Sequence, residues 1–196
     1  MNQTHTLPPS DGEDRIRALF EESGAILQGH FYRLSGRHTD WYVQCARLFE
    51  NHQTGEWVGR ALADKCKDFA PEVVLSAAIG GVLPGYEVAR ALGLNLFYCE
   101  KRDGALILRR GFTLRPGARV LIVEDEISTG QSIREMMEIV HALDGVVAGV
   151  GCLVDKSGGT APLNVPLVSL ITLNAAHYRP DTCPMCRQGQ PLQNLR

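Results

Sequence analysis

The chain lacks any long apolar run. No segment approaches the roughly 20 consecutive apolar residues that a membrane-spanning helix needs. The opening residues, Met-Asn-Gln-Thr-His-Thr-Leu-Pro-Pro-Ser, contain no basic stretch followed by an apolar one, which argues against a secretory leader. We therefore expect a cytoplasmic protein with no membrane partner.

An excess of positive charge is also missing. The 196 residues carry 20 Lys and Arg against 22 Asp and Glu, a formal net charge of −2. This balance provides no general electrostatic attraction for nucleic acid, so we expect no nucleic-acid partner. Any site that binds an anion must be built locally from a few residues. The hydrophobic content of 44% is, by contrast, enough for a substantial core.

The six cysteines do not form the pattern of a secreted disulfide framework, so we expect reduced thiols. Cys183 and Cys186 form a Cys-Pro-Met-Cys knuckle that could donate two thiolates to zinc, with His177 or a second subunit completing the site. A closed zinc site takes four ligands, however, and the chain has no second knuckle. The sequence therefore favours a packed, metal-free turn with less than one zinc per chain, and zinc stays the alternative.

Apolar runs alternate with helical patterns through the middle of the chain. Residues 73–79, Val-Val-Leu-Ser-Ala-Ala-Ile, form an almost unbroken apolar run, as in a strand covered on both faces. The other elements expected here are a helix at about 82–92 and strands at 94–99, 119–123 and 146–154. Such alternation predicts an α/β fold with a parallel sheet.

We expect one domain with a tail at each end. Residues 1–11 resemble a flexible tail, and the domain is expected to span 12–192 with its core at 54–173. The C-terminal tail with the Cys-x-x-Cys knuckle is expected at 177–196.

The segment 120–132, Val-Leu-Ile-Val-Glu-Asp-Glu-Ile-Ser-Thr-Gly-Gln-Ser, is the most informative part of the sequence. It reads as an apolar strand that ends in carboxylates and then turns through small hydroxyl and glycine residues into a helix. Such a loop offers unpaired backbone N–H groups and the positive end of a helix dipole to a phosphate. Glu124 and Asp125 would repel an anion, but they can accept hydrogen bonds from the vicinal hydroxyls of a sugar. The combination predicts a cradle for ribose 5-phosphate.

A second strand end is expected to face the same pocket. Ligands of a doubly wound sheet collect at the carboxyl ends of its strands, and residues 78–81, Ala-Ile-Gly-Gly, end the apolar run described above. A ligand with a phosphate at one end and a more highly charged group at the other suits this arrangement. The polar stretch 100–111 adds four cations, Lys101, Arg102, Arg109 and Arg110.

These segments resemble the type I phosphoribosyltransferases. Residues 120–132 look like the signature with which that family binds phosphoribosyl pyrophosphate (PRPP), with Asp125 and Thr129-Gly130 at the expected places. Taken together, the similar segments cover most of residues 12–192 and resemble orotate phosphoribosyltransferase. They also include Gly-His-Phe-Tyr-Arg-Leu-Ser-Gly-Arg-His at 29–38, Ala-Ile-Gly-Gly-Val-Leu-Pro-Gly-Tyr-Glu at 78–87, Glu-Lys-Arg-Asp-Gly and Leu-Arg-Arg-Gly-Phe within 100–112, and Val-Asp-Lys-Ser-Gly-Gly at 154–159.

The resemblance implies a fold and a reaction. The fold would have a central mostly parallel sheet flanked by helices, a small hood built from 12–50 with part of the C-terminal region, and a mobile catalytic loop at 100–111. The reaction would be Mg²⁺-dependent transfer of ribose 5-phosphate from PRPP to orotate, giving orotidine 5′-phosphate and pyrophosphate in pyrimidine (UMP) biosynthesis. Mg²⁺ would be held mainly by the substrate. A loop that reaches the neighbouring subunit implies a homodimer with shared active sites.

The resemblance also assigns roles to residues. Asp125, Lys101 and Arg102 are implied as catalytic, and Ser128 and Lys156 as contacts of the base. The implied PRPP site consists of Ala78, Ile79, Gly80, Gly81, Lys101, Arg102, Glu124, Asp125, Glu126, Ile127, Ser128, Thr129, Gly130, Gln131 and Ser132. Within this set, the loop would hold the 5-phosphate, the adjacent carboxylates the ribose hydroxyls and the Gly-Gly turn the pyrophosphate.

Several positions depart from the family's pattern. The family usually has Asp where Glu124 stands, an aliphatic residue where Glu126 stands and Thr where Ser128 stands. Lys156 stands where orotate enzymes commonly place an Arg, and lysine lacks the planar fork that fixes a flat ligand. His38 stands where many relatives carry a Lys near pyrophosphate. A transferase for a different nucleobase therefore stays open, as does a non-catalytic regulator that senses PRPP.

Each motif also has a purely structural interpretation. An acidic pair before a glycine loop can be only a strand end and a helix cap. Gly80 and Gly81 can simply permit close helix packing, and the arginines of 100–111 can form a solvated hairpin. His30 is expected to be structural.

Overall fold

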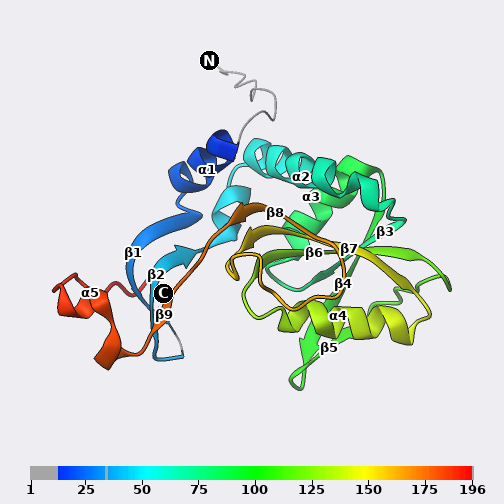
Figure 1. Ribbon diagram of the computed structural model, residues 1–196. Coiled ribbons are helices and arrows are strands. Elements are labelled where there is room, and N and C mark those ends of the chain that lie inside the picture. The colour runs from blue at the N-terminus through cyan, green and yellow to red at the C-terminus, as the bar shows by residue number, and fades with distance from the viewer. Residues whose placement is uncertain (1–12, 34, 196) are drawn as a thin grey trace, which may run out of the picture.

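Two β-sheets organise the chain (Figure 1). The computed structural model describes residues 13–33 and 35–195, so the tail expected at 1–11 lies outside the described residues. The larger sheet has the strand order β5-β4-β3-β6-β7-β8 and the smaller one the order β1-β2-β9. The strands are β1 Ile26–Tyr32, β2 His38–Val43, β3 Val73–Ala77, β4 Asn95–Arg102, β5 Ala105–Leu108, β6 Arg119–Ile127, β7 Val146–Asp155, β8 Leu167–Thr172 and β9 His177–Tyr178.

Two helices connect parallel strands of the larger sheet, α3 between β3 and β4 and α4 between β6 and β7. The α-helices are α1 Glu13–Glu22, α2 His52–Cys66, α3 Val82–Leu92, α4 Gln131–Ala142 and α5 Pro184–Arg187, and the 3₁₀ segments are Cys45–Phe49, Lys67–Phe69 and Pro180–Thr182. Within the part of the chain that the structure describes, none of these helices has the length and apolarity to span a bilayer.

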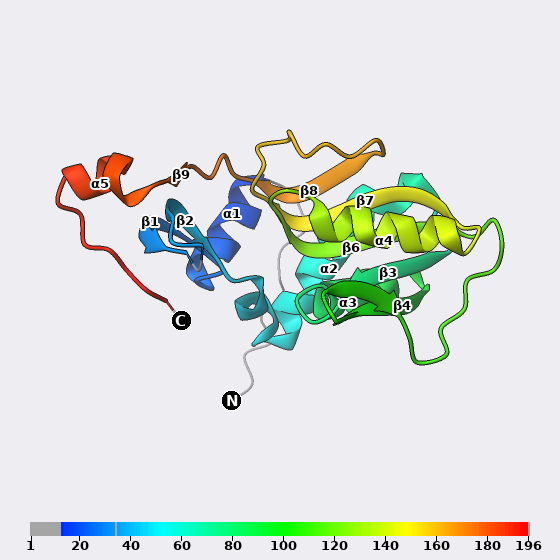
Figure 2. The ribbon, with the colours of Figure 1, turned by 90° about the horizontal axis from the view of Figure 1, so that it is seen from below.

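The larger sheet is buried between two layers of helices (Figure 2). Helices α2 and α3 pack on one face, where Leu62 and Val88 are fully buried, and α4 covers the other face with Ile133 and Met136. Strand β3 runs parallel to β4 and β6, and β7 runs parallel to β6 and β8. The predicted mostly parallel sheet is therefore confirmed, and its central strands are apolar because both faces are covered.

The stretch 100–111 contains a β-hairpin. Strands β4 and β5 are antiparallel, and their two-residue turn is Asp103-Gly104, both at positive φ. An Asp-Gly dipeptide between strand-forming residues favours this turn, because both of its positions need left-handed backbone. The structural interpretation of this stretch already included a hairpin, and its role as a mobile catalytic loop stays a prediction.

The small sheet lies beside the larger one and receives the C-terminal tail (Figure 1). Strand β9 pairs with the start of β2, and the tail then returns along β1, where the Gln193 N–H donates to His30 O at 2.8 Å and the Tyr32 N–H donates to Gln193 O at 2.9 Å. The hairpin β1-β2 and the C-terminal tail are thus parts of one structural unit.

Candidate active site

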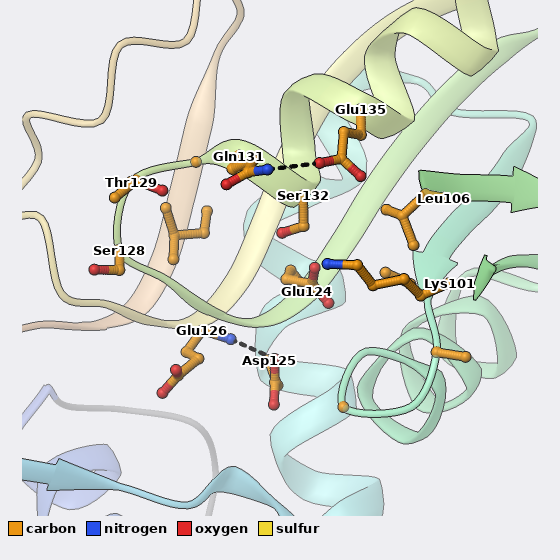
Figure 3. Close-up of a pocket in the computed structure, with 15 residues that line it drawn as sticks. Lys101, Leu106, Glu124, Asp125, Glu126, Ser128, Thr129, Gln131, Ser132 and Glu135 are labelled. Atoms are coloured by element: carbon orange, nitrogen blue, oxygen red, sulfur yellow. Dashed lines mark hydrogen bonds between the residues drawn. The ribbon is translucent and has the colours of Figure 1, made fainter. Parts of the chain in front are cut away.

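A cavity of about 430 Å³ lies at the carboxyl ends of β3 and β6 (Figure 3). These strands are parallel neighbours, with Ser76 beside Val123, so the turns that follow them meet at one edge of the sheet. The lining residues are Ala77, Ala78, Gly80, Lys101, Leu106, Glu124, Asp125, Glu126, Ile127, Ser128, Thr129, Gly130, Gln131, Ser132 and Glu135.

The loop after β6 can bind an anion. Strand β6 ends at Ile127 and α4 begins at Gln131, with Gly130 at the N-cap and φ at +72°. Gly130 provides no side chain to cap the helix, so the first N–H groups of α4 can serve a ligand. A Cβ at Gly130 would lie 3.2 Å from Leu163 Cδ2. The positive φ therefore favours glycine, and a side chain here would also lie tightly against Leu163.

Two carboxyl groups lie at the base of this loop, Glu124 buried and Asp125 partly buried. Glu124 is 5% exposed, and burial together with the charge of Asp125 raises its pKa to about 8, although a hydrogen bond with Ser132 opposes the shift. Burial and the charge of Glu126 raise the pKa of Asp125 as well. Asp125 Oδ1 accepts a hydrogen bond from the Glu126 N–H at 2.8 Å. Crowded carboxyl groups of this kind favour a ligand that brings hydroxyl donors or a cation.

Gly80 and Gly81 bring the turn after β3 against these carboxyl groups. A Cβ at Gly80 would lie 2.4 Å from Asp125 Oδ2, and one at Gly81 would lie 2.5 Å from Glu124 Oε1. The peptide bond between Ala78 and Ile79 is cis, and the Ile79 side chain is 90% exposed. The glycines therefore make room for the carboxylates of β6, which is more than the close helix packing of the structural interpretation.

One of the four expected cations is placed in the cavity. Lys101, near the end of β4, lines the cavity and points toward Glu124 (Figure 3). Arg102 lies outside the lining, exposed beside the turn, with its Nε 3.7 Å from Asp103 Oδ2. The hairpin turns the Arg102 side chain into solvent, and the implied contact of Arg102 with PRPP stays a prediction.

Arg110 stabilises the hairpin instead of the cavity. Its guanidinium donates to Glu100 at 2.7 Å and lies 5.7 Å from the centre of the Tyr98 ring. The same hydrogen bond lowers the pKa of Glu100. These contacts agree with the solvated-hairpin interpretation of this residue.

A second cavity, of about 410 Å³, lies between the small sheet and the end of β6. Lys156, the expected base contact, lines this second cavity, whereas Ser128 lines the first one. Glu126 lines both. The two expected base contacts are thus not in one cavity but in adjacent ones that share Glu126. The other residues of the second lining are Phe31, Tyr32, Arg33, Ser35, Thr39, Trp41, Tyr42, Val43, Asn194 and Leu195.

Some of the remaining predicted site residues line the first cavity and others do not. The loop 124–132 lines the first cavity throughout, whereas Ile79 and Gly81 lie outside its lining. Sequence reasoning missed Leu106 and Glu135, which line it from β5 and α4. Glu135 Oε1 accepts a hydrogen bond from Gln131 Nε2 at 2.9 Å. The i, i+4 spacing of this pair on a helix is the signal that could have found Glu135.

His38, which stands where many relatives carry a Lys near pyrophosphate, lies away from the candidate active site. His38 starts β2 in the small sheet, where it is buried against His30 with the two rings 4.8 Å apart. It is absent from the linings of both cavities described above. The reason is that β2 directs this side chain toward the C-terminal tail.

Comparison with known proteins agrees with this geometry. Residues 45–181 match the sequence profile of the phosphoribosyl transferase domain. The chain belongs to the phosphoribosyltransferase family. The match covers the larger sheet and the loop after β6, so the expected fold class and family are confirmed.

Two curated relatives of this phosphoribosyltransferase are orotate phosphoribosyltransferases. The chain is 46% identical over 178 residues to an orotate phosphoribosyltransferase of Pelotomaculum thermopropionicum, covering 91% of this chain and 94% of the relative. It is 42% identical over 178 residues to the orotate phosphoribosyltransferase of Thermotoga maritima, covering 91% and 95%.

Solved structures show the same fold. Orotate phosphoribosyltransferase from Aeropyrum pernix superimposes with a TM-score of 0.68 at 26% identity, covering 81% of this chain and 94% of the other. UMP synthase of Leishmania donovani gives a TM-score of 0.71 at 19% identity, covering 84% and 37%, and at that identity shows likeness of fold alone.

Proposed function

We propose that the chain transfers ribose 5-phosphate from PRPP to orotate, forming orotidine 5′-phosphate and pyrophosphate in pyrimidine biosynthesis. The observation that carries this proposal is the pairing of the phosphate loop 128–132 with the carboxyls of Glu124 and Asp125 in one cavity, in a chain so similar to curated orotate phosphoribosyltransferases. Its substrates are polar metabolites, which supports a cytoplasmic location.

The phosphoryl end of PRPP fits the loop after β6. The N–H groups at the start of α4 and the hydroxyl groups of Ser128, Thr129 and Ser132 are donors for the 5-phosphate. Glu124 and Asp125 are acceptors for the ribose hydroxyls. This division keeps the anionic phosphate at the positive end of a helix and away from the carboxylates.

The pyrophosphate end fits between Lys101 and the turn at 78–81. Lys101 lines the cavity from β4, opposite the loop, and its ammonium group can neutralise charge on a departing pyrophosphate. Transfer at the anomeric carbon passes through a cationic sugar, so the protein mainly has to hold both partners in line and stabilise the leaving group. The glycines at 80 and 81 let that turn lie close to the carboxyl groups of Asp125 and Glu124.

Mg²⁺ fits the donor set of the cavity. Carboxylate oxygens are hard ligands, and the carboxyls of Glu124, Asp125, Glu126 and Glu135 all line the cavity. The raised pKa values of Glu124 and Asp125 reflect crowding that a cation would relieve. When bound with PRPP, Mg²⁺ would supply neutralisation of the phosphate oxygens.

The second cavity is the proposed place of the base. Trp41 and Tyr42 provide apolar surface for a flat ring, and Lys156 and Arg33 provide cations for a carboxylate. It adjoins the first cavity at Glu126, so a base there would lie next to the sugar. We propose in addition that the small sheet acts as the hood over this base.

A homodimer with shared sites is the proposed assembly. The start of α3 exposes Leu83 and Tyr86, which lie on one face of the helix, and Ile79 is exposed immediately before it. This apolar patch adjoins the turn at 78–81, so a second copy packed there would border the active site. Light scattering coupled to size-exclusion chromatography would measure the mass of the assembly, which we expect to be twice that of the chain.

The function is tested with PRPP, Mg²⁺ and a panel of bases that includes orotate, uracil, adenine and hypoxanthine. We expect pyrophosphate release with orotate and no release without a base. Release only with another base would establish a transferase of different specificity. PRPP binding measured by calorimetry, without release for any base, would establish a non-catalytic sensor.

A further inference from the structure

Four metal-ligating side chains meet at the junction of the small sheet and the C-terminal tail. His30 comes from β1, His38 from β2, and Cys183 and Cys186 from the start and middle of α5. Their ligand atoms all lie within 4.8 Å of one another. Figure 1 shows α5 beside the β1-β2 hairpin, far along the molecule from α4 and the candidate active site.

The distances match a tetrahedral ion. Tetrahedral zinc with Zn–N of about 2.05 Å and Zn–S of about 2.3 Å separates two nitrogens by about 3.3 Å and a nitrogen from a sulfur by about 3.6 Å. His30 Nε2 lies 2.9 Å from His38 Nδ1, 3.5 Å from Cys183 Sγ and 3.7 Å from Cys186 Sγ. Cys186 Sγ lies 3.3 Å from His38 Nδ1. These four separations lie within about 0.4 Å of the tetrahedral values, and all four atoms lie within 4.8 Å of one another.

The orientation of His30 supports metal binding. Its other ring nitrogen, Nδ1, lies 2.9 Å from Gln190 O, a carbonyl that can only accept a hydrogen bond. Nδ1 must then carry the proton, which leaves the lone pair of Nε2 directed at the cluster. Histidine ligands of zinc are held by such a bond from the remote nitrogen. Gln190 belongs to the same tail as the thiols, since its N–H donates to Met185 O at 3.0 Å.

We propose that His30, His38, Cys183 and Cys186 form a structural zinc site. Two thiolates and two imidazoles are a donor set typical of zinc, and atoms packed this closely surround a single ion rather than an iron–sulfur cluster. Four protein ligands fill the tetrahedron and leave no position for substrate, which identifies a structural rather than a catalytic ion.

This assignment reverses the expectation of a metal-free turn and agrees with the expected structural role of His30. Sequence reasoning lacked the second half of the site because His30 and His38 lie about 150 positions before the cysteines and join them only through the small sheet. His177, the ligand considered from the sequence, lies instead with its Nε2 3.2 Å from Arg33 Nη1.

The ion would fasten the tail onto the hairpin. Beyond the cysteines the tail runs along β1 through Gln193, and Asn194 and Leu195 line the second cavity. Strand β9 contributes only two residues to the small sheet, so few backbone bonds hold the tail there. Bound zinc would hold Asn194 and Leu195 in the wall of that cavity.

The first test measures metal in untagged protein purified under reducing conditions and dialysed against metal-free buffer. We expect one zinc per chain by mass spectrometry of the metal, and loss of at least nine-tenths of it in the double variant Cys183→Ser/Cys186→Ser and in His38→Ala. His177→Ala is the matched control and should keep its zinc. Zinc retained by the cysteine double variant, or iron in place of zinc in the wild type, overturns the proposal.

A second test needs no variant and so is independent of folding defects. Zinc is removed from the wild type with a chelator and replaced by Co²⁺. We expect a thiolate-to-cobalt charge-transfer band and the intense visible bands of tetrahedral cobalt at one equivalent. Less than a tenth of a zinc per chain together with no such bands overturns the proposal. Both readouts are taken without substrate, so they are independent of the proposed transferase activity.

Discussion

Lys156 Nζ lies 2.6 Å from Glu126 Oε1, across the parallel pair formed by the ends of β6 and β7. The Lys156 side chain is only 7% exposed, whereas that of Glu126 is 34% exposed. Both positions depart from the pattern of the orotate enzymes that the chain resembles, and the structure shows that these two departures contact each other. The acid at 126 neutralises a lysine that would otherwise be a buried, unpaired cation.

Replacing Glu126 by Ala should destabilise the chain. Removing one partner of a fully buried pair costs about 3–5 kcal/mol, and the partial exposure of Glu126 reduces this to about 1–2 kcal/mol. Urea unfolding monitored by circular dichroism measures the change. Glu50→Ala is the control, because the pair between Arg47 and Glu50 is exposed and should change stability by less than about 1 kcal/mol. Equal effects in the two variants would contradict the account of Lys156.

The contact between Lys156 and Glu126 also shows what the sequence can and cannot provide. The phosphate loop was predictable because strand, carboxylates, glycine and helix are contiguous in 120–132, and each acts through local backbone geometry. The pairing of Glu126 with Lys156 depends on the register of β6 against β7, which no local pattern specifies. The same holds for the cluster of His30 with Cys183, which depends on where the tail crosses the small sheet.

The hairpin β4-β5 is a different case, since a local signal for it is present in the sequence. Asp103-Gly104 is a strong two-residue turn signal, and a solvated hairpin was the structural alternative for the basic stretch 100–111. The turn also explains the position of the cations. It leaves Lys101 on the strand facing the cavity and turns Arg102 into solvent.

Replacing Asp125 by Asn should lower kcat/KM for PRPP about tenfold to hundredfold. The reason is that a hydrogen bond to a charged group is worth about 1.5–3 kcal/mol, and the amide is a weaker acceptor for a ribose hydroxyl. Pyrophosphate release at varied PRPP measures the loss. Asp64→Asn, an exposed position on α2 next to Lys67, is the control and should retain the wild-type value. A kcat/KM within threefold of the wild-type value would contradict the role of Asp125 in binding the ribose.

The raised pKa of Glu124 should make the ligand-free chain less stable as the pH rises. Its pKa is about 8 in the folded chain, against about 4.3 for an unfolded glutamate. The folded state therefore binds more protons between these values, so the associated stability is full at low pH and is lost as the pH approaches 8. The free energy of unfolding, measured by urea titration, should fall by on the order of 2 kcal/mol between pH 6 and pH 8, relative to the change in Glu124→Gln. Parallel pH profiles for the two proteins would contradict the burial argument.

Lys101 and Arg102 should differ in their effect on turnover, although they are neighbours of the same charge. Lys101 lines the cavity and points toward Glu124, where it can neutralise the leaving pyrophosphate, so Lys101→Ala should lower kcat about a hundredfold. The side chain of Arg102 is 61% exposed and lies beside Asp103, so Arg102→Ala should lower kcat less than tenfold. Steady-state kinetics at saturating PRPP and orotate measures both variants, with equal unfolding midpoints as the control for folding. A larger loss for Arg102→Ala than for Lys101→Ala would mean that the hairpin rearranges during turnover and brings Arg102 to the substrate.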